Sequence, residues 1–203
     1  LTTRISGEYI NFDNTKYRIV GIEEIGGQKL TKVIMADYTK NSNAIAESVT
    51  FGVTDDNSGT IFTTESGIGE YLNNWYTGTS INSTYKSMIE TNGIVWYQGP
   101  TDGINDDYTK SKQGTAVSAT IGLGRYGEMF TSQYGSSSSS SSPIWIITRK
   151  SNNQLYEIDN YGTGSKTLKP TESSGVRPAF YLKSNVKISS GTGLPNNPYE
   201  IVQ

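Results

Sequence analysis

The chain has 203 residues, which is the size of one domain, and its 17 Lys and Arg residues against 19 Asp and Glu residues give a formal net charge of −2. This balance provides no basic surface for phosphate groups, so general nucleic-acid binding and attachment to an anionic membrane surface are disfavoured. Cys and His are both absent, which excludes a Ser-His-Asp triad, a cysteine nucleophile, disulfides and metal sites built from imidazole or thiolate ligands, and leaves oxygen-bound cations as the metals to consider.

The rest of the composition is typical of exported surface domains. Charged residues make up only 18% of the chain, whereas Tyr alone contributes 14 residues and Gly 22. No apolar run is long enough to span a bilayer, so no membrane insertion is expected within these residues. The chain opens at Leu1 without an initiator Met or a leader. We therefore expect residues 1–203 to be a single soluble domain cut from a longer exported protein.

The first predicted element is a β-hairpin. Residues 17–24 and 28–37 are rich in β-branched and apolar side chains. Gly26 and Gly27 between them can adopt the positive φ angles that a two-residue hairpin turn requires. Residues 48–53 fit a further strand.

The pattern changes to helical spacing in the next segment. Apolar residues recur at i, i+4, i+7 and i+8 through residues 66–78, with Ser66 as a candidate N-cap, which predicts a helix. A second short helix fits residues 83–90, and residues 94–97 fit a buried strand. Residues 99–114 carry little apolar material and are expected to form a long surface excursion.

The second half is predicted to return to strands. Residues 116–123 fit a strand and residues 125–132 a short helix. Seven consecutive serines at residues 136–142 cannot bury enough apolar area to offset the entropy of ordering them, so a loop is expected there. Residues 144–149 and 154–159 fit two strands joined by a polar turn.

The last part of the chain is expected to contain a loop and two strands. Residues 160–175 are rich in Gly, Ser and Thr and are expected to be a loop. Residues 176–183 form a strong strand pattern whose proline must lie at an edge, a bulge or the strand start. Residues 191–202 fit a turn and a short closing strand. We expect the strands at the two ends of the chain to pair, with Arg18 and Phe180 in one sheet.

Four blocks in order cover almost the whole chain: residues 11–22 (NFDNTKYRIVGI), 68–76 (IGEYLNNWY), 121–130 (IGLGRYGEMF) and 174–202 (SGVRPAFYLKSNVKISSGTGLPNNPYEIV). Together they resemble an uncharacterised surface domain of exported proteins in Firmicutes and mollicutes. This resemblance implies an α+β, C-type lectin-like fold with paired terminal strands, two short helices and long loop excursions. It also implies an extracellular location, at the cell surface or on a type IV pilus-like filament.

The candidate ligand-binding residues lie in the expected loops. Tyrosines interleaved with Ser, Gly, Asn and Asp form the mixture that binding loops use, because Tyr supplies rigid contact area and the small polar residues adapt to the ligand. The segments 99–114, 133–143 and 160–175 are expected to form one face. The candidates on this face and at its border are Tyr97, Asp102, Asn105, Asp106, Asp107, Tyr108, Tyr134 and Tyr161.

Other candidate motifs in the sequence also have simpler interpretations. The acids at residues 102–107 could gather calcium or form a solvated loop, and the tripeptides that hold calcium and sugar in C-type lectins are absent. No metal or other cofactor is therefore expected, with calcium as the open alternative. Ser83 and Lys86 match the S-x-x-K of Ser-Lys acylases, but the companion motifs are missing. The tryptophans are interpreted as core residues, and Arg177 as a structural residue that contacts carboxylates or carbonyl groups.

We therefore expect a non-enzymatic domain, with no catalytic residues, that presents loops for adhesion. The partner would be a host or matrix glycan or protein, and no nucleic acid. The alternative is a structural subunit of a pilus-like or pseudopilus-like filament, in which the same loops contact only other filament subunits and no separate ligand is bound.

Overall fold

The structure, a computed structural model, describes residues 1–40, 47–99, 112–131, 143–158 and 165–203. It is mostly β, with 43% strand and 11% helix, and its described strands form three sheets of mixed direction without a closed barrel. The expected α+β, C-type lectin-like fold is therefore wrong. The physical reason is that the strands at residues 48–50, 144–151 and 154–158 pair with two strands inside residues 165–175, a segment expected to be a loop, and so form a second sheet that the expected fold does not contain.

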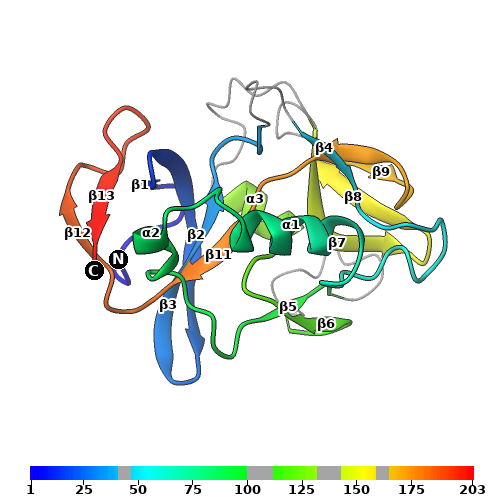
Figure 1. Ribbon diagram of the computed structural model, residues 1–203, viewed down its shortest axis with the longest axis horizontal. Coiled ribbons are helices and arrows are strands. Elements are labelled where there is room, and N and C mark those ends of the chain that lie inside the picture. Colours follow the sequence, from blue (N-terminus) through cyan, green and yellow to red (C-terminus); the bar gives the residue numbers. More distant parts are fainter. Residues whose placement is uncertain (41–46, 100–111, 132–142, 159–164) are drawn as a thin grey trace.

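The largest sheet has six strands in the order β11-β3-β2-β1-β13-β12 (Figure 1). Neighbouring strands are antiparallel except for β1 and β13, which are parallel. Arg18 on β2 and Phe180 on β11 lie in this one sheet, which confirms that the two ends of the chain pair. The bounds are β1 Tyr9–Phe12, β2 Thr15–Ile25, β3 Gln28–Met35, β11 Ala179–Leu182, β12 Lys187–Ser190 and β13 Tyr199–Val202.

The predicted hairpin is confirmed as β2 and β3. Gly26 and Gly27 have φ angles of 59° and 75°, so both occupy the left-handed region that a type I′ turn needs. The pairing register shifts between Ile19 and Gly21, so β2 contains a bulge near its middle. After the bulge, Gly21 lies opposite Lys32 of β3.

A second sheet of five strands has the order β4-β10-β7-β8-β9. The strands predicted at residues 144–149 and 154–159 are confirmed as β7 and β8, whereas β9 and β10 occupy much of the segment expected to be a loop. Trp145 of β7 is fully buried and its Nε1 donates to Val49 O at 2.7 Å. The bounds are β4 Ser48–Thr50, β7 Ile144–Ser151, β8 Gln154–Ile158, β9 Ser165–Leu168 and β10 Ser173–Gly175.

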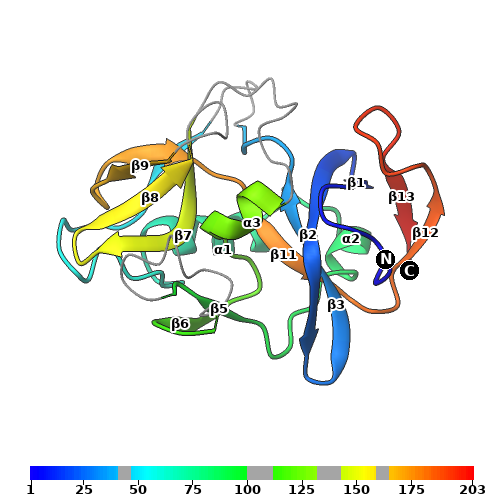
Figure 2. The same ribbon diagram turned by 180° about the vertical axis from the view of Figure 1, so that it is seen from behind.

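The described residues contain three helices and a third, two-stranded sheet. The helix predicted at residues 66–78 is confirmed, but the one predicted at residues 83–90 is a single turn and the strand predicted at 116–123 has only three residues. Helices α1 and α2 lie on the near side in Figure 1, and α3 lies on the opposite side, in front in Figure 2. The bounds are α1 Gly67–Thr77, α2 Ser83–Lys86, α3 Tyr126–Thr131, β5 Val95–Tyr97 and β6 Ala116–Ser118.

The face of the six-stranded sheet toward α2 carries an aromatic cluster. The ring of Phe12 packs against Tyr17, Tyr85 and Phe180 with centroid distances of 5.5, 5.1 and 4.9 Å. Edge-to-face contacts of this kind add to the large apolar area that each ring buries. This cluster joins α2 and three strands of the sheet into one core.

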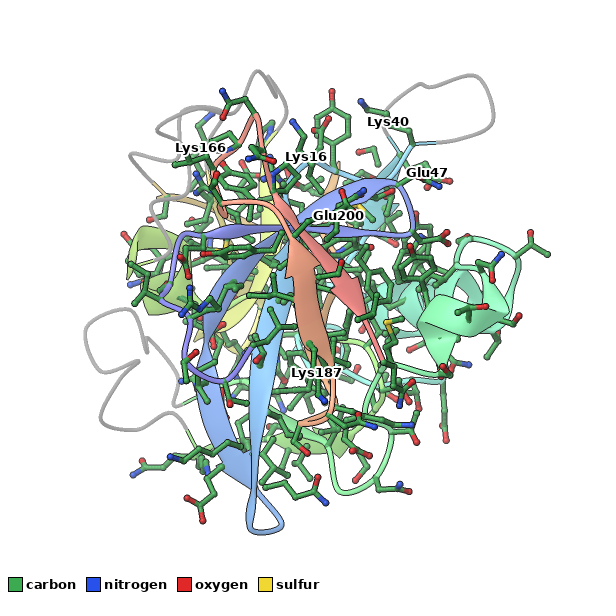
Figure 3. All side chains as sticks on the ribbon, turned by 90° about the vertical axis from the view of Figure 1, so that its left-hand side faces the viewer. Lys16, Lys40, Glu47, Lys166, Lys187 and Glu200 are labelled. Atoms are coloured by element: carbon green, nitrogen blue, oxygen red, sulfur yellow. The ribbon has the colours of Figure 1, made fainter. Side chains whose placement is uncertain are left out.

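The two ends of the chain are also joined by polar contacts. Asn11 of β1 lies opposite Lys16 of β2 and Glu200 of β13 in the sheet register. Its Nδ2 donates to both carboxylate oxygens of Glu200, at 2.9 and 3.1 Å. Figure 3, seen from the β12 and β13 side, shows Lys16 and Glu200 on this surface, and Figure 1 places the two termini side by side. Strands from the two ends of the chain are therefore joined to each other within the six-stranded sheet.

Candidate functional site

Seven of the eight candidate ligand-binding residues lie outside the described residues. These are Asp102, Asn105, Asp106, Asp107, Tyr108, Tyr134 and Tyr161. The eighth, Tyr97, is half-buried at the end of β5. It lines a pocket of about 210 Å³.

The pocket lies where the β2–β3 hairpin meets β5 and β11. Residues 23–26, at the end of β2 and in the turn, line it together with Gly93 and Val95 at the start of β5. Lys32 of β3, Trp96 of β5 and Tyr181 of β11 line it as well. Because these elements belong to the six-stranded sheet and the short β5–β6 sheet, the pocket forms at the junction of two sheets.

Lys32 is the buried charge of this pocket. Its side chain is 3% exposed, and Nζ lies 2.6 Å from Oε1 of Glu128 on α3, whose side chain is 16% exposed. The ammonium also lies 4.8 Å from the centroid of Trp96 and 5.6 Å from that of Tyr181. An ion pair and two ring faces thus offset the cost of burying the charge.

Two glycines near these bulky side chains have different surroundings. Gly21 lies opposite Lys32 in the sheet, and a Cβ at Gly21 would have no heavy atom within 4 Å, so space remains beside the lysine. A Cβ at Gly122 would lie 2.2 Å from Cδ2 of Trp96. The indole therefore packs flat on backbone that only glycine can provide, while its Nε1 donates to Ala119 O at 2.8 Å.

Tyr181 connects Lys32 to the acidic side of the pocket. Its hydroxyl donates to Oε1 of Glu23 at 2.9 Å. Burial raises the pKa of Tyr181 well above its ordinary value, and the negative charges of Glu23 and Glu128 raise it further. The phenol therefore stays protonated at physiological pH and remains a donor to Glu23.

The rim of the pocket carries both signs of charge. Glu24 and Lys112 are exposed, and Arg125 is half-buried. The backbone N–H of Arg125 donates to Oε2 of Glu128 at 2.9 Å, so the segment before α3 is tied to the buried ion pair. The two lining carboxylates, Glu23 and Glu24, thus face two rim cations.

The described residues contain no group of three or more Asp, Glu, His or Cys side chains placed to hold a metal ion. In the turn near residue 55, Asp56 forms its hydrogen bonds with neighbours in that turn. Oδ1 of Asp56 accepts hydrogen bonds from the Ser58 hydroxyl at 2.5 Å and from Thr54 Oγ1 at 2.8 Å. These bonds, with others from backbone N–H groups, lower the pKa of Asp56 to about 2.

The other residues singled out in the sequence have structural contacts. Arg177 is buried and its Nη1 donates to Ala36 O at 2.7 Å, as expected of a structural arginine. Lys86 of the S-x-x-K segment donates from Nζ to Gly78 O at 2.6 Å, at the carboxyl end of α1. Trp96 and Trp145 are buried, which confirms them as core residues, whereas Trp75 is only partly buried.

The sequence reasoning missed Lys32, Glu128, Tyr181 and Glu23. One signal was present: Lys32 interrupts the apolar run of its strand, where a charge needs a buried partner. The partner, Glu128, lies 96 positions away, and no local pattern identifies it.

Within the part of the chain that the structure describes, no helix combines the length and apolar character needed to cross a bilayer. No family model, no curated protein and no solved structure matches the chain.

Proposed function

We propose that this protein is a non-enzymatic binding domain whose ligand occupies the pocket between the β2–β3 hairpin, β5 and β11. The observation that carries the proposal is the lysine at this pocket. Lys32 lines the cavity with its side chain almost completely buried, and among the described residues Glu128 alone accepts a hydrogen bond from its ammonium, so the remaining N–H groups can recognise a ligand oxygen.

The construction of the pocket supports binding by a preformed site. Its buried groups are fixed by the ion pair to Glu128, by the ring contacts of Trp96 and by the hydrogen bond from Tyr181 to Glu23. A site that is already ordered loses little conformational entropy when a ligand enters. The same partners occupy the lysine and tyrosine that could otherwise serve as a nucleophile or base, which favours binding over catalysis.

We propose an extracellular setting, at the cell surface or on a filament. Support comes from the low charge content, from the many Tyr and Gly residues, and from the resemblance of residues 174–202 to an exported domain. In this setting the domain would contribute to adhesion through its surface, with a host or matrix molecule as the partner, and the pocket would bind a small ligand. The structural alternative, a filament subunit without a separate ligand, predicts that the pocket binds no ligand.

Saturation-transfer NMR tests the proposal. The purified protein is screened against mixtures of small metabolites and oligosaccharides, and each hit is repeated with Glu23→Gln and with the control Lys29→Gln, an exposed residue of β3 outside the pocket. We expect at least one ligand that binds the wild type and the control and is recovered chemically unchanged, but whose signal falls with Glu23→Gln. The proposal would be contradicted if no compound binds, or if every compound that binds gives the same signal with Glu23→Gln as with the wild type.

A further inference from the structure

We infer that the pocket takes a small zwitterion of the free α-amino-acid type, with its carboxylate on Lys32 and its ammonium beside Glu23. This inference rests on the proposed function and specifies the class of ligand. It follows from the spare hydrogen-bonding groups, the balance of charge, the burial of the rings and the volume of the pocket.

The carboxylate position is defined by Lys32. An ammonium has three N–H donors. Glu128 accepts one of them at 2.6 Å, and no further hydrogen-bond acceptor for Nζ occurs among the described residues. The rings of Trp96 and Tyr181 attract the cation through their faces but do not replace full hydrogen bonds. A ligand carboxylate in the pocket supplies the missing acceptors.

The ammonium position is defined by Glu23. Its Oε1 accepts from Tyr181, and within the described part of the chain its Oε2 accepts no hydrogen bond. In the register Glu23 lies opposite Leu30, two residues from Lys32 along β3, so the acid and the lysine are diagonal neighbours about 7–8 Å apart at their backbones. Both residues line the pocket, so a small ligand with one charge of each sign can lie between the acid and the lysine.

The charge balance disfavours a simple ion. Lys32 is paired with Glu128, and in the described part of the chain the pocket is also lined by the acids Glu23 and Glu24 and by the cations Lys112 and Arg125. A ligand with charges of one sign only would therefore lie near side chains of its own sign. A ligand with one charge of each sign avoids both repulsions.

Ring burial disfavours a sugar. Carbohydrates commonly stack on an accessible aromatic face, but Trp96 and Tyr181 are each only 3% exposed, and both rings lie against Lys32. Among the described residues that line the pocket, Tyr97 alone offers a half-buried ring. The pocket, with a volume of about 210 Å³, is large enough for a ligand the size of alanine or serine.

Isothermal titration calorimetry with four probes tests the inference: L-alanine, L-alaninamide, N-acetyl-L-alanine and glucose. We expect L-alanine to bind and the two analogues, each lacking one charge, to bind about 10- to 100-fold more weakly, which is the range for a charge-assisted hydrogen bond. Glu23→Gln keeps an acceptor for the Tyr181 hydroxyl and should weaken the binding of L-alanine by a similar factor. Lys29→Gln should leave the affinity unchanged.

The outcomes separate the two proposals. Glucose binding that depends on Glu23, without L-alanine binding, would overturn the zwitterion and leave the proposed function standing. L-Alanine binding that is equal for both analogues, or equal for the wild type and Glu23→Gln, would also overturn the inference. If none of the four probes binds and the metabolite screen finds no ligand that depends on the pocket, the proposed function fails together with the inference.

Discussion

Replacement of Lys32 by Met is expected to destabilise the fold strongly, although Met keeps most of the apolar stem. At 2.6 Å the attraction between Nζ and the Glu128 carboxylate is about 6 kcal/mol at an effective dielectric constant of about 20. Much of this attraction offsets the desolvation of the two groups, so the pair itself contributes little net stability. The single variant is different, because it leaves the carboxylate buried without its cation.

We expect Lys32→Met to lower the free energy of unfolding by about 3 kcal/mol. Loss of one partner from a buried ion pair costs about 3–5 kcal/mol. The lower end applies here because Glu128 is 16% exposed and keeps the hydrogen bond from the Arg125 backbone. In a domain of this size the loss corresponds to a decrease in Tm of about 6–12 °C.

The double variant Lys32→Met with Glu128→Gln is the matched control. Gln keeps an acceptor for the Arg125 N–H and carries no charge, so most of the lost stability should return, to within about 1.5 kcal/mol of the wild type. Urea unfolding followed by tryptophan fluorescence measures all three proteins. A single variant within 0.5 kcal/mol of the wild type, or a double variant no more stable than the single one, would refute the account of the buried pair.

Two further changes test other parts of the structure. Gly122→Ala places a Cβ 2.2 Å from Cδ2 of Trp96 and should lower the free energy of unfolding, measured in urea, by about 1–3 kcal/mol. Gly21→Ala, where the Cβ meets nothing within 4 Å, should leave that free energy unchanged. Equal effects of the two variants would contradict the described packing. The folded-state pKa of Asp56, about 2, lies below its ordinary value of 3.8, so its contribution to stability is present above pH 3.8 and is lost as the pH falls toward 2. Thermal unfolding between pH 6 and 2 should therefore show a smaller acid-induced loss for Asp56→Asn than for the wild type. An equal loss in the two proteins would contradict this role of Asp56.

The β2–β3 hairpin can be predicted from residues that are close together in the sequence. The paired glycines at residues 26 and 27 demand a tight turn, and the strands beside them carry enough β-branched residues to specify the register. The helix at residues 67–77 can be predicted in the same way, because its apolar stripe has helical spacing. These elements depend on neighbours in the sequence.

The second sheet depends instead on strand pairing that the local sequence pattern does not reveal. Strand β9, with the sequence SKTL, has no apolar alternation and becomes a strand by pairing with β8. Strand β10, SSG, likewise pairs with β4 more than 120 residues earlier in the chain. Polar segments of this kind match a loop composition equally well, and only the tertiary pairing decides between the two.

The candidate site was predictable only in part. Tyr97 was chosen from the tyrosine-rich composition, and it does line the described pocket. The charges that define that pocket were not found, because Lys32 and Glu128 meet across the interior between a central strand and α3. A single sequence reveals a misplaced charge in a strand, but it does not reveal which distant carboxylate neutralises it.

The most direct test of a ligand at Lys32 is NMR of the lysine ε-methylene groups during a titration with L-alanine. The account predicts that the ε-CH₂ signal of Lys32 shifts in proportion to binding, while that of Lys29 on the same strand stays in place. Saturation of the protein with L-alanine while the Lys32 signal remains unmoved would contradict the account.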